Sequence, residues 1–149
     1  MKFSTKGRYG LKAMLDLAVH NNEGQVVLKS IADRQGLSES YLEQLFAALK
    51  KAKLVKSVRG SQGGYTLAEE PEKITVGDIL RVLEGSTVSN DCVVENGECC
   101  SSSYNCCVTK SVWLKIQEGI DNVTNNITLQ QLVDDFNRTK SHEESMFYI

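Results

Sequence analysis

The sequence has no long hydrophobic run. Although 41% of its 149 residues are hydrophobic, no window approaches the roughly 18 uninterrupted apolar residues of a membrane-spanning helix. Residues 1–8 also lack the apolar stretch and small-residue cleavage site of a secretory signal peptide. We therefore expect a cytoplasmic protein with no membrane partner. The chain shows no acid–base pair and no nucleophile beside an orienting base, so the sequence predicts that the protein is not an enzyme.

Cysteine is missing from most of the chain, because all five cysteines lie within residues 92–107. In a reducing cytoplasm such a cluster indicates a metal or redox site rather than a disulfide framework. An iron–sulfur cluster needs thiolate ligands of this kind. A structural zinc site is a weaker alternative because no Cys-x-x-Cys motif occurs here, and a metal-free thiol switch is another. The cysteines are Cys92, Cys99, Cys100, Cys106 and Cys107.

Charge is divided unequally along the chain, whose net charge is −2. Residues 1–67 contain 11 of the 17 Lys and Arg residues and 5 of the 19 Asp and Glu residues, a net charge of +6. Residues 68–149 carry a net charge of −8. This division suggests that the first half binds nucleic acid, because Lys and Arg supply most of the non-specific affinity for phosphates.

Residues 5–36 predict two helices that lead into a turn. Apolar residues recur at three- and four-residue steps from Thr5 to about His20, which predicts an amphipathic helix with Asp16 on its solvent-exposed face. A short helix is expected over residues 30–35. Gly36 breaks it, because glycine accepts the left-handed backbone of a tight turn.

A further helix, from about Glu39 to Lys53, completes a helix-turn-helix motif. Ser38 or Ser40 is expected to cap it, and Ser40 and Glu43 have the spacing of a capping box. One side of this helix is apolar, and the other would read base edges in a DNA major groove. The residues expected to face outward are Ser40, Tyr41, Glu43, Gln44 and Ala47.

A glycine-tipped hairpin follows the helix-turn-helix. Residues 54–59 alternate like a strand, residues 60–64 form a turn, and residues 65–68 return as the paired strand. Together these elements predict a winged helix-turn-helix domain, so the fold class is mainly α with a small β wing.

Individual roles on DNA follow from side-chain chemistry. Gln44 can bond adenine bidentately. Glu43 can accept a hydrogen bond from cytosine but is repelled by phosphate, so it acts either as a selectivity filter or as the cap partner of Ser40. Arg59 is placed to enter a minor groove. The residues predicted to contact DNA are Ser38, Ser40, Tyr41, Glu43, Gln44, Lys56, Ser57, Arg59 and Ser61.

The second half of the chain predicts three more helices. The first is capped by Thr75 and Asp78 and stops at Gly85. The second, over residues 108–123, is long and amphipathic. It carries a stripe that a lone helix cannot bury, so we expect it to pack on a second copy of itself. The stripe contains Val112, Trp113, Ile116, Ile120 and Val123.

The third of these helices is expected to be short. Thr128 caps it, Gln131 stands at the capping-box position, and the helix is expected to end at Asp135. Residues 137–149 are then expected to form a polar tail.

Four separated motifs stand out: Lys-Gly-Arg-Tyr-Gly-Leu-Lys-Ala-Met-Leu-Asp-Leu-Ala, Ser-Glu-Ser-Tyr-Leu-Glu-Gln-Leu-Phe, Val-Arg-Gly-Ser-Gln-Gly-Gly-Tyr-Thr-Leu and Asn-Asn-Ile-Thr-Leu-Gln-Gln-Leu-Val. In this order they closely resemble the IscR-type branch of the Rrf2 family of bacterial transcription regulators. The resemblance spans nearly the whole chain up to about Asp135. It implies a winged-helix domain, a long dimerisation helix and, between them, a loop that holds an iron–sulfur cluster through three cysteines.

This resemblance, with the patterns above, gives a domain organisation. A DNA-binding domain covers 1–85, a cysteine-rich cluster-binding loop covers 86–107, a dimerisation helix and short packing helix cover 108–136, and a polar tail covers 137–149. The expected partners are a second copy of the chain and double-stranded DNA with a roughly palindromic operator.

The ligand set departs from the family's pattern. That pattern has a histidine three residues after the third cysteine, as the fourth ligand to a [2Fe-2S] centre, and here Lys110 stands at that position. Protonated lysine cannot ligate iron, so the fourth ligand is an extra cysteine or a carboxylate. A [4Fe-4S] centre is an alternative. Two registers are open, anchored at Trp113 or on equal spacing: Cys92, Cys100 and Cys107, or Cys92, Cys99 and Cys106.

These features predict a DNA-binding transcriptional regulator that senses iron–sulfur cluster status and controls iron–sulfur biogenesis or related genes. One alternative is a nitric oxide-sensing or thiol-redox regulator of the same family. Another is a metal-free regulator controlled by a partner protein, which Lys110 favours.

Overall fold

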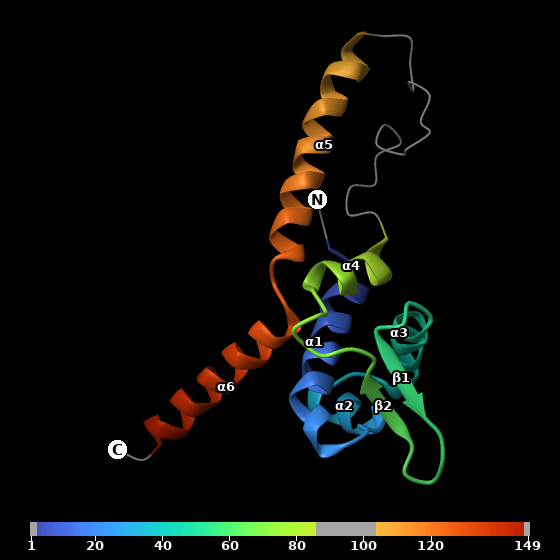
Figure 1. Cartoon of the computed structure of the whole chain (residues 1–149), viewed down its shortest axis with the longest axis vertical. Helices are drawn as coiled ribbons and strands as arrows, with labels where there is room; N and C mark the ends of the chain where they lie inside the picture. Colours follow the sequence, from blue (N-terminus) through green and yellow to red (C-terminus); the bar gives the residue numbers. More distant parts are fainter. Residues whose placement is uncertain (1–2, 86–103, 148–149) are drawn as a thin grey trace.

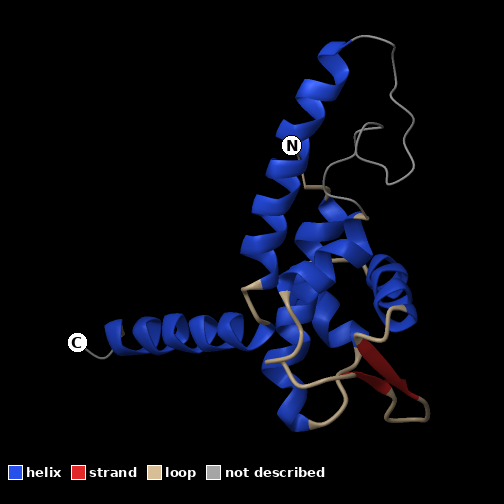
Figure 2. Cartoon of the chain, turned by 45° about the horizontal axis from the view of Figure 1, so that its top comes forward, coloured by secondary structure: helices blue, strands red, loops and turns tan. Residues whose placement is uncertain are grey.

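Helices dominate the described part of the chain, together with one two-stranded sheet (Figure 1, Figure 2). The structure, a computed structural model, describes residues 3–85 and 104–147, with side chains from residue 108 onwards in the second range. No helix in these ranges is long and apolar enough to cross a membrane. In chain order the elements are α1 (Thr5–His20), the 3₁₀ turn η1 (Asn21–Glu23), α2 (Leu28–Gln35), α3 (Glu39–Lys51), β1 (Val55–Val58), β2 (Gly64–Leu67), α4 (Val76–Glu84), α5 (Tyr104–Asn125) and α6 (Leu129–Met146).

α2 and α3 form the helix-turn-helix. Gly36 ends α2 with φ 65° and ψ 35°, a left-handed conformation that glycine adopts without strain. The Ser38 hydroxyl accepts a hydrogen bond from the Tyr41 N–H at 3.2 Å and so caps α3. The predicted capping box between Ser40 and Glu43 is therefore wrong, because Ser40 already lies inside the first turn of the helix.

The wing is an antiparallel hairpin in which Val55 stands opposite Leu67. Val26, just before α2, adds an isolated bridge to Tyr65 through two backbone hydrogen bonds of 2.8 Å each. A Cβ at Gly64 would lie 2.5 Å from the Val26 carbonyl oxygen, so this close approach requires glycine. The predicted fold, mainly α with a small β wing, is confirmed.

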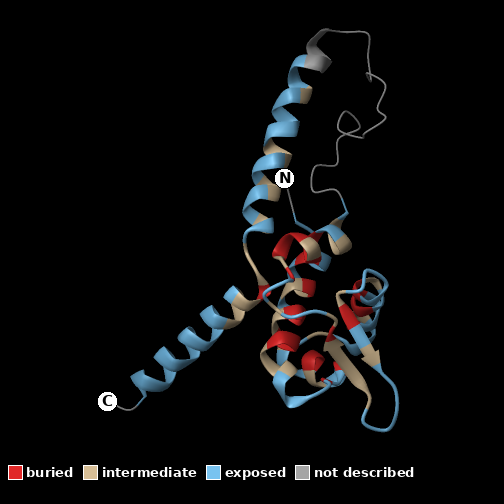
Figure 3. Cartoon of the chain, in the orientation of Figure 1, coloured by how far each residue is buried: buried red, intermediate tan, exposed pale blue. Residues whose placement is uncertain are grey.

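The hydrophobic core lies mainly within the winged-helix part of the molecule, and Leu129 of α6 completes it. Figure 3 shows buried residues concentrated there and at the start of α6, whereas α5 and most of α6 are exposed or half-buried. Each helix from α1 to α4 contributes apolar side chains to this core, as does β1. Its fully buried members include Met14, Leu17, Ile31, Phe46, Val55 and Ile79.

α6 is longer than the sequence pattern suggested. It runs from Leu129 to Met146 and projects from the rest of the chain (Figure 1), so the predicted end of this helix at Asp135 is wrong. The expected polar tail is helical from residue 137 to Met146. Residues 129–147 contain neither glycine nor proline, so nothing in this stretch breaks a helix. An ion pair between Arg138 and Asp135 spans the expected boundary.

Both later capping boxes are confirmed. Thr128 and Gln131 begin α6, and Thr75 and Asp78 begin α4. The Asp78 carboxylate accepts hydrogen bonds from the Thr75 N–H at 3.0 Å and from Arg81 at 2.8 Å. Partial burial raises the pKa of Asp78, but the hydrogen bonds from Thr75 and Arg81 lower it by more, so this pKa lies below its ordinary value of 3.8.

We expect Asp78→Asn to be less stable than the native chain at neutral pH and to lose that disadvantage in acid. A lowered folded-state pKa means that folding favours the carboxylate. The contribution is therefore complete above about pH 4 and is lost as the pH falls through the folded-state pKa. Denaturant unfolding at neutral pH and near about pH 3 measures the difference. A difference of the same size at both pH values would assign the effect to packing instead.

The first turn of α1 is capped by a side chain from another helix. Glu84, the last residue of α4, accepts hydrogen bonds on Oε1 from the Ser4 N–H at 2.8 Å, the Ser4 hydroxyl at 2.8 Å and the Gly7 N–H at 3.1 Å. A carboxylate there satisfies unpaired N–H groups and faces the positive end of the helix dipole. A Cβ at Gly7 would lie 2.2 Å from the same oxygen, so glycine admits the contact.

Removing this cap with Glu84→Ala is expected to lower the free energy of unfolding by about 1–2 kcal/mol. Amide hydrogen exchange over residues 4–8 should accelerate, because the first turn of α1 loses its acceptor. Glu72→Ala is the matched control, since Glu72 is exposed and makes no side-chain hydrogen bond within residues 3–85 and 108–147. Equal destabilisation by the two variants would contradict the assignment.

Candidate nucleic-acid interface

The predicted reading face of α3 is exposed. Ser40, Glu43, Gln44 and Ala47 are all exposed, and residues three and four apart lie on one side of a helix. Leu42, Leu45, Phe46 and Leu49 occupy the core side of α3. α3 thus presents a short polar surface directed away from the core.

Tyr41 is the exception among the predicted reading residues. It is half-buried, and its ring packs edge-on against Tyr9 of α1 with 6.3 Å between ring centroids. Its buried hydroxyl oxygen has no hydrogen-bond partner in the described part of the chain. The expectation that Tyr41 faces outward is therefore wrong, because the ring fills space between α1 and α3. With Lys6, Gln44 and Leu83 it lines a cavity of about 130 Å³ where α1, α3 and α4 meet.

The wing exposes most of its predicted contact residues. Ser57 is half-buried, because it alternates with exposed neighbours along β1. Near the tip, the Gln25 side chain donates a hydrogen bond to the Gln62 carbonyl at 2.6 Å, which ties the wing to the start of the helix-turn-helix. The exposed predicted residues are Lys56, Arg59 and Ser61.

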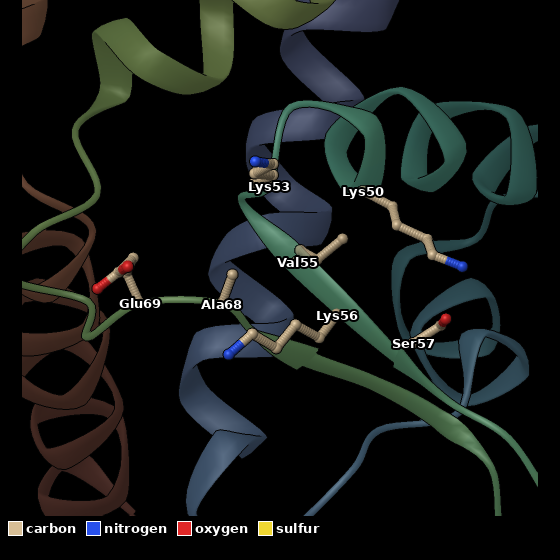
Figure 4. Close-up of a pocket in the computed structure, with 7 residues that line it drawn as sticks. All are labelled: Lys50, Lys53, Val55, Lys56, Ser57, Ala68 and Glu69. Atoms are coloured by element: carbon tan, nitrogen blue, oxygen red, sulfur yellow. The ribbon is translucent and has the colours of Figure 1, made fainter.

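A basic cleft of about 530 Å³ lies where α3 meets the wing (Figure 4). Lys50 comes from α3, Lys53 from the connecting turn and Lys56 from β1, and Figure 4 shows their ammonium groups spread around Val55. None of the three makes an ion pair within the described residues, although Glu69 also lines the cleft. Lys50 and Lys53 are not among the residues predicted from the sequence to contact DNA. The available signal was the lysine-rich stretch that covers the end of α3 and the start of the wing.

A buried ion pair fixes α2 to α1. The Asp16 side chain is only 3% exposed. Its carboxylate accepts hydrogen bonds from Arg34 Nη2 at 2.6 Å, Arg34 Nε at 3.0 and 3.1 Å, and Gln35 Nε2 at 2.9 Å. The hydrogen bond to Asp16 raises the pKa of Arg34 above its ordinary value. The prediction that Asp16 faces solvent is wrong, because the last turn of α2 covers it.

The cysteine-rich segment enters the described structure only at its end. α5 begins at Tyr104, earlier than the expected start at Val108, so the backbone of Cys106 and Cys107 is helical. Lys110 is half-buried one turn further along. The other predicted ligands lie outside the described residues: Cys92, Cys99 and Cys100.

Residues 3–135 match the Rrf2 family, described as an iron-dependent transcriptional regulator. The chain belongs to the Rrf2 family. The HTH-type transcriptional regulator CymR of Bacillus subtilis is 45% identical to this Rrf2 chain over 150 residues, 100% of both chains. The structure of T. potens IscR is 56% identical with a TM-score of 0.73, over 91% of this chain and 88% of that one. The structure of CymR, the global cysteine regulator of B. subtilis, also has a TM-score of 0.73 at 45% identity, over 90% and 97% of the two chains.

These similarities confirm the winged-helix fold and the regulatory class. The protein is an Rrf2-family transcriptional regulator, and its named relatives are regulators rather than enzymes. Relatives named IscR and CymR are both similar to it.

Proposed function

We propose that this Rrf2 protein is a cytoplasmic, homodimeric DNA-binding regulator whose affinity for its operators depends on an iron–sulfur cluster. The cluster is a [2Fe-2S] centre, with [4Fe-4S] as the alternative, and the regulated genes serve iron–sulfur biogenesis or related processes. The observation that carries the proposal is that all five thiols lie in one segment, whose last two cysteines fall in the first turn of α5.

The residues present fit such a cluster. Iron–sulfur clusters are held by thiolates, and unpaired N–H groups at a helix N-terminus favour negative charge. Lys110 lies one turn beyond Cys106 and Cys107 and adds a positive charge that favours anionic sulfur ligands. Five thiols supply a fourth thiolate where Lys110 replaces the histidine of the related pattern. When bound, the cluster would be a group whose presence depends on redox conditions and on the availability of iron–sulfur clusters.

The contacts on both sides of the cysteine-rich segment suggest how binding of a cluster affects the DNA-binding domain. Before the segment, Glu84 bonds the first turn of α1. After it, α5 ends at Asn125, whose side chain accepts a hydrogen bond from Arg81 of α4 at 2.7 Å. In our proposal, ordering of the segment sets the angle between α5 and the winged helix. A bound cluster changes the affinity for DNA only if it favours one angle between α5 and the winged helix over another.

Dimerisation through α5 is the second part of the proposal. Val112 is 51% exposed and Trp113 39% exposed, although both are large and apolar. Asn125, which contacts α4 through Arg81, lies about 180° around the helix from Ile116. Val123 of the stripe is exposed as well, and Ile116 and Ile120 are half-buried. A second α5 would cover this stripe. A two-fold dimer would bind a roughly palindromic operator.

On DNA, we assign α3 to the major groove and the wing to flanking phosphates and a minor groove. Ser40, Glu43 and Gln44 would contact bases, with Glu43 as the selectivity filter, and Arg59 would enter the minor groove. Tyr41, whose ring is half-buried, would contribute chiefly by positioning α3. The assignment to phosphates covers Ser38, Lys56, Ser57 and Ser61.

A second candidate function is a metal-free regulator, controlled by thiol chemistry or by a partner protein. It is favoured by the 45% identity to CymR over both whole chains and by Lys110, which cannot replace a histidine ligand. A nitric oxide sensor is a variant of the first proposal and would differ from it in cluster type.

The deciding experiment is an absorbance spectrum with iron and sulfide analysis on protein purified without oxygen. We expect absorption between about 320 and 460 nm and matching amounts of iron and sulfide. Single changes of Cys106 and Cys107 to Ala then separate the two ligand registers, because only the ligand's loss should remove the colour. Colourless protein without iron or zinc that still binds duplex DNA would reject the cluster and favour the second candidate.

A further inference from the structure

We propose that Lys53 contacts DNA phosphate from a backbone conformation that glycine would adopt more readily, and that Lys50 and Lys56 extend this contact. The inference rests on the DNA-binding function proposed above. It adds a phosphate-binding surface at the junction of α3 and the wing.

The backbone at Lys53 is the first observation. Among residues 3–85 and 104–147, Lys53 is the only non-glycine residue with a positive φ, 62°. Its N–H donates to the Lys50 carbonyl at 3.0 Å, and the Leu54 N–H donates to the Leu49 carbonyl at 3.0 Å. This pair of bonds closes a helix end in the way that usually places glycine at the left-handed position. A side chain with a Cβ is disfavoured there, so its presence suggests that the side chain has a function.

The charges around Lys53 are the second observation. Lys50 and Lys56 line the same cleft, and none of the three lysines is ion-paired within the part of the chain that the structure describes. Their ammonium groups spread around Val55 rather than converging (Figure 4). A single small anion would need convergent donors, whereas a polymer of phosphates offers several separated charges.

The position of the three lysines in the fold favours duplex DNA as the polymer of phosphates. Lys50 follows Ala47 by one turn on the exposed side of α3, and Lys56 belongs to the wing. The lysines therefore lie between the two elements assigned to the major groove and to the flanking DNA. A strand of phosphates borders the groove there.

The test uses the full-length protein and a random-sequence duplex of about 30 base pairs, because phosphate contacts do not depend on sequence. Fluorescence anisotropy gives Kd at salt concentrations from about 50 to 200 mM. The variants are Lys53→Gly, which removes charge and strain, Lys53→Asn, which removes charge and tolerates the backbone, and Lys53→Arg, which keeps the charge. Lys115→Asn, at an exposed position on α5, is the control for the loss of one lysine.

We expect Lys53→Gly to unfold at the same temperature as the native protein or a higher one, yet to bind the duplex roughly 3- to 10-fold more weakly near 100 mM salt. The slope of log Kd against log salt should fall by about 1 per protomer for Lys53→Gly and Lys53→Asn. Lys53→Arg and Lys115→Asn should keep the native slope.

A native slope in both Lys53→Gly and Lys53→Asn would overturn the inference. The same anisotropy assay is run with a single-stranded RNA and with an acidic protein. If the Lys53 variants lost affinity for one of these but kept the native affinity for the duplex, the inference would be overturned as well, since the duplex would then not be the partner. If the native protein bound no duplex at any salt concentration, the proposed DNA binding would fail first, and this result is distinct from an unchanged slope.

Discussion

Asp16→Ala is expected to lower the free energy of unfolding by about 2–4 kcal/mol. Removing one partner of a buried ion pair typically costs about 3–5 kcal/mol, because the other charge is left without compensation. The expected loss is smaller here because the Arg34 side chain is 37% exposed and can turn to water. Gln35 loses the acceptor of its 2.9 Å hydrogen bond as well. Urea denaturation of the native and variant proteins measures the difference.

Arg34→Ala is the complementary variant, and it should destabilise at least as strongly as Asp16→Ala. It leaves a carboxylate whose side chain is 3% exposed without its cation, and burial penalises that charge more than it penalises the accessible guanidinium. The double variant should lose less stability than the sum of the two single losses, because the second change removes an already unpaired group. An Arg34→Ala loss below about 0.5 kcal/mol would show that the remaining neighbours of the carboxylate, Gln35 at 2.9 Å and His20 at 3.4 Å, already satisfy Asp16.

Most of the winged-helix fold could be predicted from the sequence because local signals specify it. Gly36 breaks the helix-turn-helix at the left-handed position, with φ 65°. The glycine-tipped hairpin forms within one residue of its predicted ends, and Thr75 and Asp78 form the expected capping box. Each signal acts over a few residues, so sequence spacing alone carries the information.

The errors fall where contacts join distant residues. Asp16 has the polar character of a surface residue, and only the approach of Arg34, 18 positions away, makes its burial favourable. Tyr41 follows the outward side of α3 by spacing, yet its ring turns into the junction with Tyr9 of α1. Glu84 caps α1 from 80 positions away. Helical periodicity contains no information about such partners.

In the candidate site, too, features set by local spacing could be predicted, and features set by three-dimensional arrangement could not. The exposed residues of α3 and the wing follow from periods of 3.6 and 2, so the exposure of most residues in the proposed DNA surface could be predicted. The ligand register could not, because paired cysteines at 99/100 and 106/107 offer two nearly equal spacings. A cluster selects thiols by their arrangement in three dimensions rather than by their order in the chain.

Ile116→Asp is expected to convert the proposed dimer into a monomer and to raise the Kd for an operator duplex at least about 100-fold. A carboxylate in the middle of the α5 stripe would be buried without a partner in the dimer. The monomer then loses the simultaneous binding of two half-sites. The winged helix should remain folded, because Ile116 does not belong to its core. Sedimentation analysis measures the assembly, and fluorescence anisotropy measures Kd on a duplex selected from a random library with the native protein.

Ser111→Asp is the matched control, since it adds the same carboxylate to α5 at an exposed position, about 140° around the helix from Ile116. It should remain dimeric and keep the native Kd. If Ile116→Asp also remained dimeric, the α5 stripe would not be the interface. The exposed apolar side chains of α6, Phe136 at 41% and Met146 at 76%, would then be the next surface to change. A monomeric Ile116→Asp with native operator affinity would instead separate dimerisation from DNA binding and remove the argument for a palindromic operator.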